Sequence, residues 1–409
     1  MIWLLGLFFT TLFVGMSPME ISAGLLTLFV LFTVWRRSSQ ESRWPFLPTH
    51  FEILLGLWLL VIAVGFMANG IFDQTIPLKL LEFKWILFLY LAVLAVVRSR
   101  LDEDILPWLL VPIVLACGYA IVISFTGMDP IKNELLELSG KDGFARTGGL
   151  FSDSMTLAHV YGIVFCWFFG LLLTFGRYRD KNAIWSLIAV LFLGLTVLLT
   201  FTRGMWLGIS VASVVMAFVF SRRLGSLLLA TGGVLFFGLF ELWPSFHQRI
   251  SQSLSSTEGY DSERLWIWKA NWQIFKDHPF LGAGYGENRT LMPEYFKRIG
   301  APDGTLVSHA HNQYLHFLSG TGIIGLLFYI LVLSMFFRLS CKTWNRISDR
   351  YPFHRGLCLG LLGAQVAFFV GGITEANFES AKVKYVMVMT WALVLWLAYE
   401  YRVLKSRNF

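Results

Sequence analysis

The sequence contains few charged residues, and this scarcity limits the kinds of protein it can encode. Only 14% of the 409 residues are charged, whereas 56% are hydrophobic and the mean hydropathy is +0.63. In soluble globular domains about a quarter of the residues are charged, so this composition excludes a soluble globular domain. We therefore expect an integral membrane protein.

Cysteine pairs and metal-binding motifs are missing as well. The four cysteines form no CxxC pair, and no HExxH pattern occurs anywhere in the chain. These absences argue against a disulfide framework and against a zinc site. The first apolar run has neither a basic leader nor a small-x-small cleavage site, so we expect a retained helix and not a signal peptide.

Long apolar runs recur from one end of the chain to the other. Each is long enough to approach or span a bilayer as a helix, and the first is the shortest. The pattern predicts an all-α, polytopic membrane bundle of about twelve transmembrane helices, at roughly 2–15, 20–35, 52–68, 83–97, 106–126, 154–176, 183–202, 205–220, 224–240, 314–337, 356–373 and 384–400.

The basic residues predict how this bundle is oriented. With Met1 inside, the short inner connections hold 18 of the 33 Lys and Arg residues, and the outer connections other than 241–313 hold eight. This is the positive-inside bias, and it predicts that both termini are cytoplasmic. The net charge of +7 reflects this arrangement, so we expect no nucleic-acid partner.

Two outer connections are longer than a helical bundle requires. The stretch 127–153 is rich in Gly and charge, and 241–313 is the longest polar segment of the chain. A long loop in a compact protein is usually functional or disordered. We expect one membrane unit with three parts: helices one to nine in 1–240, a loop region in 241–313, and helices ten to twelve in 314–409.

The composition of the longer loop favours order. Residues 260–280 predict a helix that Asp261 or Ser262 caps and that Pro279 ends. One face of this helix would be aromatic and would lie at the lipid headgroups or pack on the bundle; its members are Leu265, Trp268, Trp272 and Phe275.

Three arginines on the predicted outer side are candidate phosphate ligands. Arg203 stands almost without a loop between two apolar runs, and it is either a snorkelling anchor or a functional charge at the membrane edge. Arg264 opens the loop helix, where it either pairs with acidic neighbours or faces a phosphate. Arg146 is a weaker third candidate.

Two glycine clusters have more than one interpretation. GTGIIG at 320–325 matches GxGxxG, but no strand precedes it, so close helix packing explains it better than a dinucleotide loop. FLGAGYG at 280–286 is either a tight turn carrying Tyr285 or a nest of amides for phosphate.

His309 and His311 lie where the long loop meets the glycine-rich helix. An imidazole with a pKa near neutrality is a suitable general base for a hydroxyl group. Asn312 is placed to cap the following helix. His316 would point away from His311 around that helix, so we do not include it.

With these residues assembled, the chain resembles the bacterial O-antigen ligases of the WaaL type and the related Wzy-type polymerases and protein O-oligosaccharyltransferases. The most specific match is His311-Asn312, nine residues, then Gly322-Ile323-Ile324-Gly325, which fits the pattern H-[NSQ]-x9-G-x-x-G. The number of apolar runs and the long loop before the motif also fit.

The resemblance implies a GT-C-like glycosyltransferase of the bacterial inner membrane, with its active site facing the periplasm and with neither metal nor nucleotide cofactor. The donor would be a glycan on undecaprenyl diphosphate, and the acceptor a hydroxyl of the lipid A–core. His311 would be the catalytic base, and Arg203 and Arg264 would bind the diphosphate. Secondary candidates are Arg146, His309, Asn312 and Tyr285.

Other functions are consistent with much of the same pattern. A Wzy-type polymerase or a protein O-oligosaccharyltransferase would use the same donor, although one dominant loop before the motif and the absence of a further C-terminal domain in this sequence favour a ligase. A flippase for lipid-linked oligosaccharides would need ionisable residues near the middle of the membrane. The polar groups here collect at the predicted outer face instead.

Overall fold

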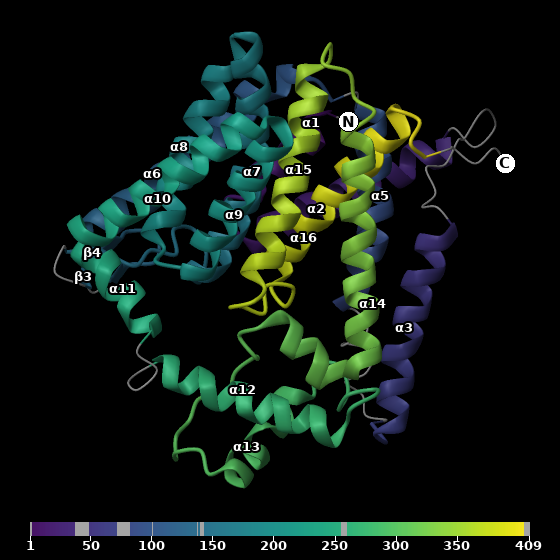
Figure 1. Cartoon of the computed structure of the whole chain (residues 1–409). Helices are drawn as coiled ribbons and strands as arrows, with labels where there is room; N and C mark the ends of the chain where they lie inside the picture. Colours follow the sequence, from purple (N-terminus) through teal and green to yellow (C-terminus); the bar gives the residue numbers. More distant parts are fainter. Residues whose placement is uncertain are drawn as a thin grey trace.

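The structure, a computed structural model, describes residues 2–36, 49–71, 82–99, 101–136, 138–139, 143–254 and 260–404. Within this part almost every regular element is a helix, which confirms the all-α fold class (Figure 1). The α-helices are α1 (Ile2–Thr11), α2 (Met16–Arg36), α3 (Thr49–Ala68), α5 (Trp85–Ser99), α6 (Leu106–Thr126), α7 (Ser154–Tyr178), α8 (Asn182–Leu199), α9 (Arg203–Phe220), α10 (Arg222–Leu242), α11 (Pro244–Leu254), α12 (Tyr260–Asp277), α13 (Asn288–Ile299), α14 (Gln313–Trp344), α15 (Pro352–Gly371) and α16 (Ala381–Glu400), with short 3-10 turns η1 (Glu82–Lys84) and η2 (Glu103–Ile105).

Each of the twelve apolar runs falls on a helix. Over the described ranges, nine helices are long and apolar enough to cross a membrane, and shorter apolar stretches lie on α2 and α5. Helix α1 is a further short helix of apolar sequence. The chain is therefore a multi-pass membrane protein. Helix α1, with 10 residues, extends about 15 Å, half the thickness of a hydrocarbon core.

The first long connection contains two small antiparallel hairpins that the sequence did not predict. Strands β1 (Met128–Asp129) and β2 (Glu134–Leu135) pair with each other, as do β3 (Leu138–Ser139) and β4 (Phe144–Ala145). The Ser124 hydroxyl donates to the carbonyl of Ala145 at 2.7 Å, which fixes the second hairpin to the end of α6.

Glycines allow α15 to approach both α7 and α9 closely. A Cβ atom added at Gly360 would lie 2.6 Å from the Trp167 backbone, and one at Gly208 would lie 2.9 Å from the Ala367 carbonyl oxygen. These are the close contacts expected of small residues four apart in membrane helices. A Cβ atom added at Gly204, in the first turn of α9, would meet the side chain of Thr374, so the α15–α16 connection also packs against the beginning of α9.

Helices α12 and α13 lie at one end of the bundle, opposite the connection between α14 and α15 (Figure 1). Between them α12 and α13 form a separate apolar core that includes Ile267, Ile274 and Met292. The aromatic face expected for α12 is not part of this core, since Leu265 and Trp272 are exposed. The predicted caps, the side chains of Asp261 and Ser262, lie outside the side chains that the structure describes.

The two glycine clusters bind each other through their backbones. Helix α14 is interrupted at Gly322, which has φ +65° and ψ −173°. The amides of Ala283 and Gly284 donate to the carbonyls of Ser319 and Gly320 at 3.0 Å. Gly320 and Gly322 of GTGIIG therefore approach another backbone closely, as predicted, but that backbone belongs to the FLGAGYG loop and not to a second helix. The alternative of an amide nest for phosphate in FLGAGYG is wrong at these two amides.

Replacing Gly322 with alanine is expected to destabilise the protein by at least about 2 kcal/mol. The new Cβ atom would lie 2.2 Å from the carbonyl oxygen of Phe280, and the backbone conformation is one that L side chains rarely adopt. Thermal unfolding in detergent measures the effect. Gly118→Ala is the matched control, because that position in α6 has open space around it. Equal stability of the two variants would contradict the prediction.

Candidate active site

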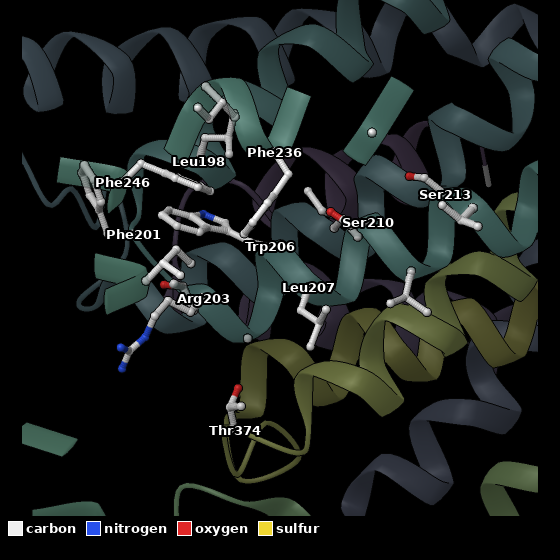
Figure 2. A pocket seen from close by; sticks show the side chains of 18 of the residues that line it. Leu198, Phe201, Arg203, Trp206, Leu207, Ser210, Ser213, Phe236, Phe246 and Thr374 are labelled. Atoms are coloured by element: carbon white, nitrogen blue, oxygen red, sulfur yellow. The ribbon is translucent and has the colours of Figure 1, made fainter. Parts of the chain in front are cut away.

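A cavity of about 980 Å³ opens where α9, α10 and α12 meet the α15–α16 connection. Most of its wall is apolar and comes from α9 and α10. Figure 2 shows Arg203 and Thr374 at one end and Ser210 and Ser213 farther along α9. The charged side chains that line the cavity are Arg146, Arg203, Arg264 and Glu375.

Arg203 enters the cavity from the turn between α8 and α9. It is the first residue of α9, and Phe201, two residues earlier, has φ +52°, which makes this turn sharp. The free amides of a helix N-terminus favour an anion at the same place. In Figure 2 the guanidinium of Arg203 points away from the surrounding apolar side chains. Arg146 approaches the same turn, with its Nε donating to the Thr200 carbonyl at 3.0 Å.

Arg264 connects α12 with the α15–α16 connection. Its Nη1 donates to the Thr374 carbonyl at 3.0 Å, and its Nη2 lies 3.5 Å from Oε2 of Glu375. The cation is thus paired with a carboxylate that is 111 positions later in the sequence. The structure brings together all three arginines that the sequence singled out.

Glu375 also binds both histidines of the SHAHN segment. His309 Nε2 lies 2.5 Å from Oε1 of Glu375, and His311 Nδ1 lies 3.2 Å from both carboxylate oxygens. His311 is almost completely buried, whereas the side chain of His309 is 37% exposed. Glu375 therefore joins the histidines to the cavity and to Arg264.

The backbone around His311 is held in an uncommon conformation. His311 has φ +46°, in the left-handed region that a residue with a side chain seldom occupies. The Asn312 side chain accepts the Leu315 amide at 2.9 Å, so it caps α14 as expected. Strain of this kind clusters at functional sites.

The contact with Glu375 also determines the tautomer of His311. Because Nδ1 donates to the carboxylate, Nε2 is the proton-accepting nitrogen, and it lies 3.4 Å from the Ser308 hydroxyl. Burial opposes ionisation of Glu375, but the hydrogen bonds and charges of His309 and His311 outweigh it, and the pKa of this carboxyl lies well below its usual value. The carboxylate is thus ionised and can stabilise an imidazolium.

No sequence motif marks Glu375. The available signal is an acidic residue in the short segment GITEANFES between two apolar helices. A polar group in such a place is a candidate for function, but the sequence does not reveal its partners.

Tyr285 and His316 belong to a second buried cluster. The Tyr285 hydroxyl donates to Oε1 of Glu379 at 3.0 Å, and His316 Nε2 lies 3.1 Å from the same oxygen. His316 Nδ1 also lies 3.1 Å from the Asn288 amide. None of these side chains lines the cavity. Tyr285 and His316 therefore belong to a cluster separate from the three arginines.

His309, His311 and Glu375 are also spaced closely enough to hold a metal ion. Their ligand atoms lie within 4.8 Å of one another. In this structure the carboxylate oxygens accept from both imidazoles and pair with Arg264. A neighbouring guanidinium opposes binding of a further cation.

This arrangement provides the components for nucleophilic substitution at a phosphate-activated carbon. Guanidiniums stabilise the negative charge that develops on a leaving diphosphate. A buried imidazole, oriented by a carboxylate, removes a proton from an attacking hydroxyl. The adjoining apolar wall is suited to a lipid chain.

Residues 187–330 match the family model described as O-antigen ligase. The match covers about a third of the chain, from α8 into α14, and includes Arg203, Arg264 and His311 but neither Arg146 nor Glu375. No curated protein matches the chain. The family match supports assignment of the chain to the O-antigen ligase family and confirms the resemblance seen in the sequence. It also supports glycosyltransferase activity, with a lipid-linked glycan and a lipid acceptor as substrates in general.

Proposed function

We propose that the protein is an O-antigen ligase of the bacterial inner membrane. It would transfer a glycan from undecaprenyl diphosphate to a hydroxyl of the lipid A–core on the periplasmic side, with both chain termini in the cytoplasm. The observation that carries the proposal is that Arg203, Arg264 and Glu375 line one cavity, and that Glu375 there contacts both Arg264 and His311. His311 itself lies behind Glu375 and not in the cavity wall.

The three arginines would bind the donor diphosphate. Arg203 and Arg264 supply guanidiniums from two different helices, and Arg146 reaches the same turn as Arg203. Guanidinium binds phosphate oxygens in a bidentate manner and keeps its charge. Loss of the lipid diphosphate places negative charge where these groups lie, so they would stabilise the transition state more than the ground state.

His311 would accept the proton of the acceptor hydroxyl at Nε2. Glu375 holds the ring through Nδ1 and would stabilise the imidazolium that forms. Attack opposite the leaving diphosphate would invert the configuration of the anomeric carbon. The donor bond supplies the energy, so the reaction would need neither a nucleotide nor a metal ion.

A chromosomal deletion tests this function and separates it from that of a polymerase. Loss of a ligase leaves bare lipid A–core and long glycan chains on undecaprenyl diphosphate, whereas loss of a polymerase leaves core that carries a single repeat unit. Gel analysis of lipopolysaccharide, together with analysis of the lipid-linked pool, distinguishes these outcomes. Unchanged long-chain lipopolysaccharide in the deletion strain would contradict the proposal.

A further inference from the structure

The cavity continues as a slot along the length of α9. We use "slot" for the part of the cavity between α9 and α10, which is lined by Ser210, Ser213 and Val214 of α9 and by Leu229, Gly232, Gly233 and Phe236 of α10. The lining extends from Arg203 to Val215, which corresponds to about 18 Å along a helix. This is more than half of a hydrocarbon core about 30 Å thick. The slot thus leads from the arginines into the membrane interior.

Protein covers little of the helix that forms one wall of this slot. In α10 only Gly225 is buried, and Leu229 and Leu235 are more than half exposed. Near the arginine end, Trp206 stacks on Phe246 with ring centroids 5.0 Å apart, and both line the cavity (Figure 2). The slot therefore has an aromatic entrance and a mostly apolar interior.

Gly232 and Gly233 differ from the packing glycines of the bundle. A Cβ atom added at Gly208 or Gly360 would collide with the backbone of a neighbouring helix, which is the usual use of glycine in membrane helices. A Cβ atom added at Gly232 or Gly233 would meet nothing within 4 Å, and both positions line the slot. These two glycines therefore provide space in the slot and do not serve helix contact.

We propose that Gly232 and Gly233 determine which lipid carrier the protein accepts, by making the slot wide enough for the polyprenyl chain of a lipid diphosphate. This inference rests on the proposed function. A polyprenyl chain has a methyl branch and a double bond in every isoprene unit, so its cross-section is larger than that of a straight acyl chain. Removing side chains at two successive positions gives the needed width.

The charged side chains at the arginine end of the cavity also favour a polyprenyl diphosphate. Three arginines and one carboxylate line this end, which leaves an excess of positive charge. A diphosphate complements that excess better than the single phosphodiester of a membrane phospholipid. A single-chain lipid with a diphosphate headgroup thus satisfies both ends of the cavity.

Bulky substitutions in the slot test the proposal, with a control on the same helix. Gly233→Phe and Gly232→Phe place a ring in the slot, whereas Gly238→Phe changes α10 at a position that is equally open but does not line the cavity. All three replace glycine within a helix, so loss of the fold would affect them alike. The purified variants are assayed with one glycan carried on undecaprenyl diphosphate or on geranyl diphosphate.

The expected result is a selective loss of the long carrier. In Gly232→Phe and Gly233→Phe, KM for the undecaprenyl donor rises about tenfold and kcat changes little. A tenfold weaker affinity corresponds to losing the burial of about two methylene groups. Gly232 lies ten residues before the end of α10, about 15 Å deep, so the geranyl chain stops short of it and its KM stays unchanged. Gly238→Phe behaves like the wild type with both donors.

Two results would overturn the inference. One is an equal effect of Gly238→Phe and Gly233→Phe on the undecaprenyl donor, and the other is an equal loss of both donors in the slot variants. Failure of the proposed function is a different outcome, in which the wild type transfers from neither donor. In that case, thermal stabilisation by undecaprenyl diphosphate alone still tests the inference. The proposal predicts that this ligand raises the melting temperature of the wild type but not that of Gly233→Phe, and any other result contradicts it.

Discussion

His311→Ala is expected to lower the rate of glycan transfer by about a thousandfold while the protein inserts and folds as before, because removing a general base typically costs a factor of about 10² to 10⁴. The side chain is buried and Glu375 holds its Nδ1, so replacement by alanine removes the proton acceptor at Nε2. Transfer in vitro from a lipid-linked donor, normalised to folded protein by size-exclusion chromatography, measures the effect.

His309→Ala is the matched variant for this experiment. His309 lies two residues before His311 and binds the same carboxylate, but its side chain is more exposed. Its replacement is therefore expected to lower the transfer rate about tenfold or less. The opposite order of the two effects would assign the base to His309. A parallel assay with EDTA separates a base from a metal ligand, because wild-type transfer should persist. Full activity of His311→Ala would contradict the proposed mechanism.

Much of the fold could be predicted because the membrane restricts the choices. Apolar runs of sufficient length must be helices in lipid, where backbone groups need internal partners. Each predicted run accordingly coincides with a helix. The helix in the long loop was also predictable, since Pro279 ends it close to the observed boundary at Asp277. The small hairpins between 128 and 145 were not, because strands of two residues have no periodicity.

The site was predicted less completely, for a physical reason. Arg203, Arg264 and His311 each stand out locally, as charged or polar residues at helix ends or within a motif. Glu375 acquires its importance from contacts with residues 64 and 111 positions away, and no local pattern encodes such distances. Tyr285 illustrates the reverse case, since its place in a conspicuous glycine cluster suggested the site but the chain turns it toward Glu379.

Arg264→Ala is expected to lower kcat/KM by about a hundredfold to a thousandfold, as found when one donor to a developing negative charge is removed. Arg264→Lys should recover little of this loss. The planar guanidinium has several donors, so it can bind the Thr374 carbonyl, Glu375 and a phosphate at the same time, whereas a compact ammonium group cannot. Two roles of Arg264 would each explain such a loss of activity. Arg264 either binds the diphosphate or only balances the buried charge of Glu375.

A double-mutant cycle with Glu375→Gln separates these reasons. Glutamine keeps the shape of the side chain but removes the charge that Arg264 neutralises, and alone it is expected to cost about a hundredfold through weaker support of the His311 imidazolium. If Arg264 only balances Glu375, Arg264→Ala costs nothing further in the Glu375→Gln background. Diphosphate binding predicts that it still costs at least about tenfold, with the loss shared between KM for the donor and kcat. An additional cost near zero would remove Arg264 from the diphosphate site and leave Arg203 and Arg146 to bind the leaving group.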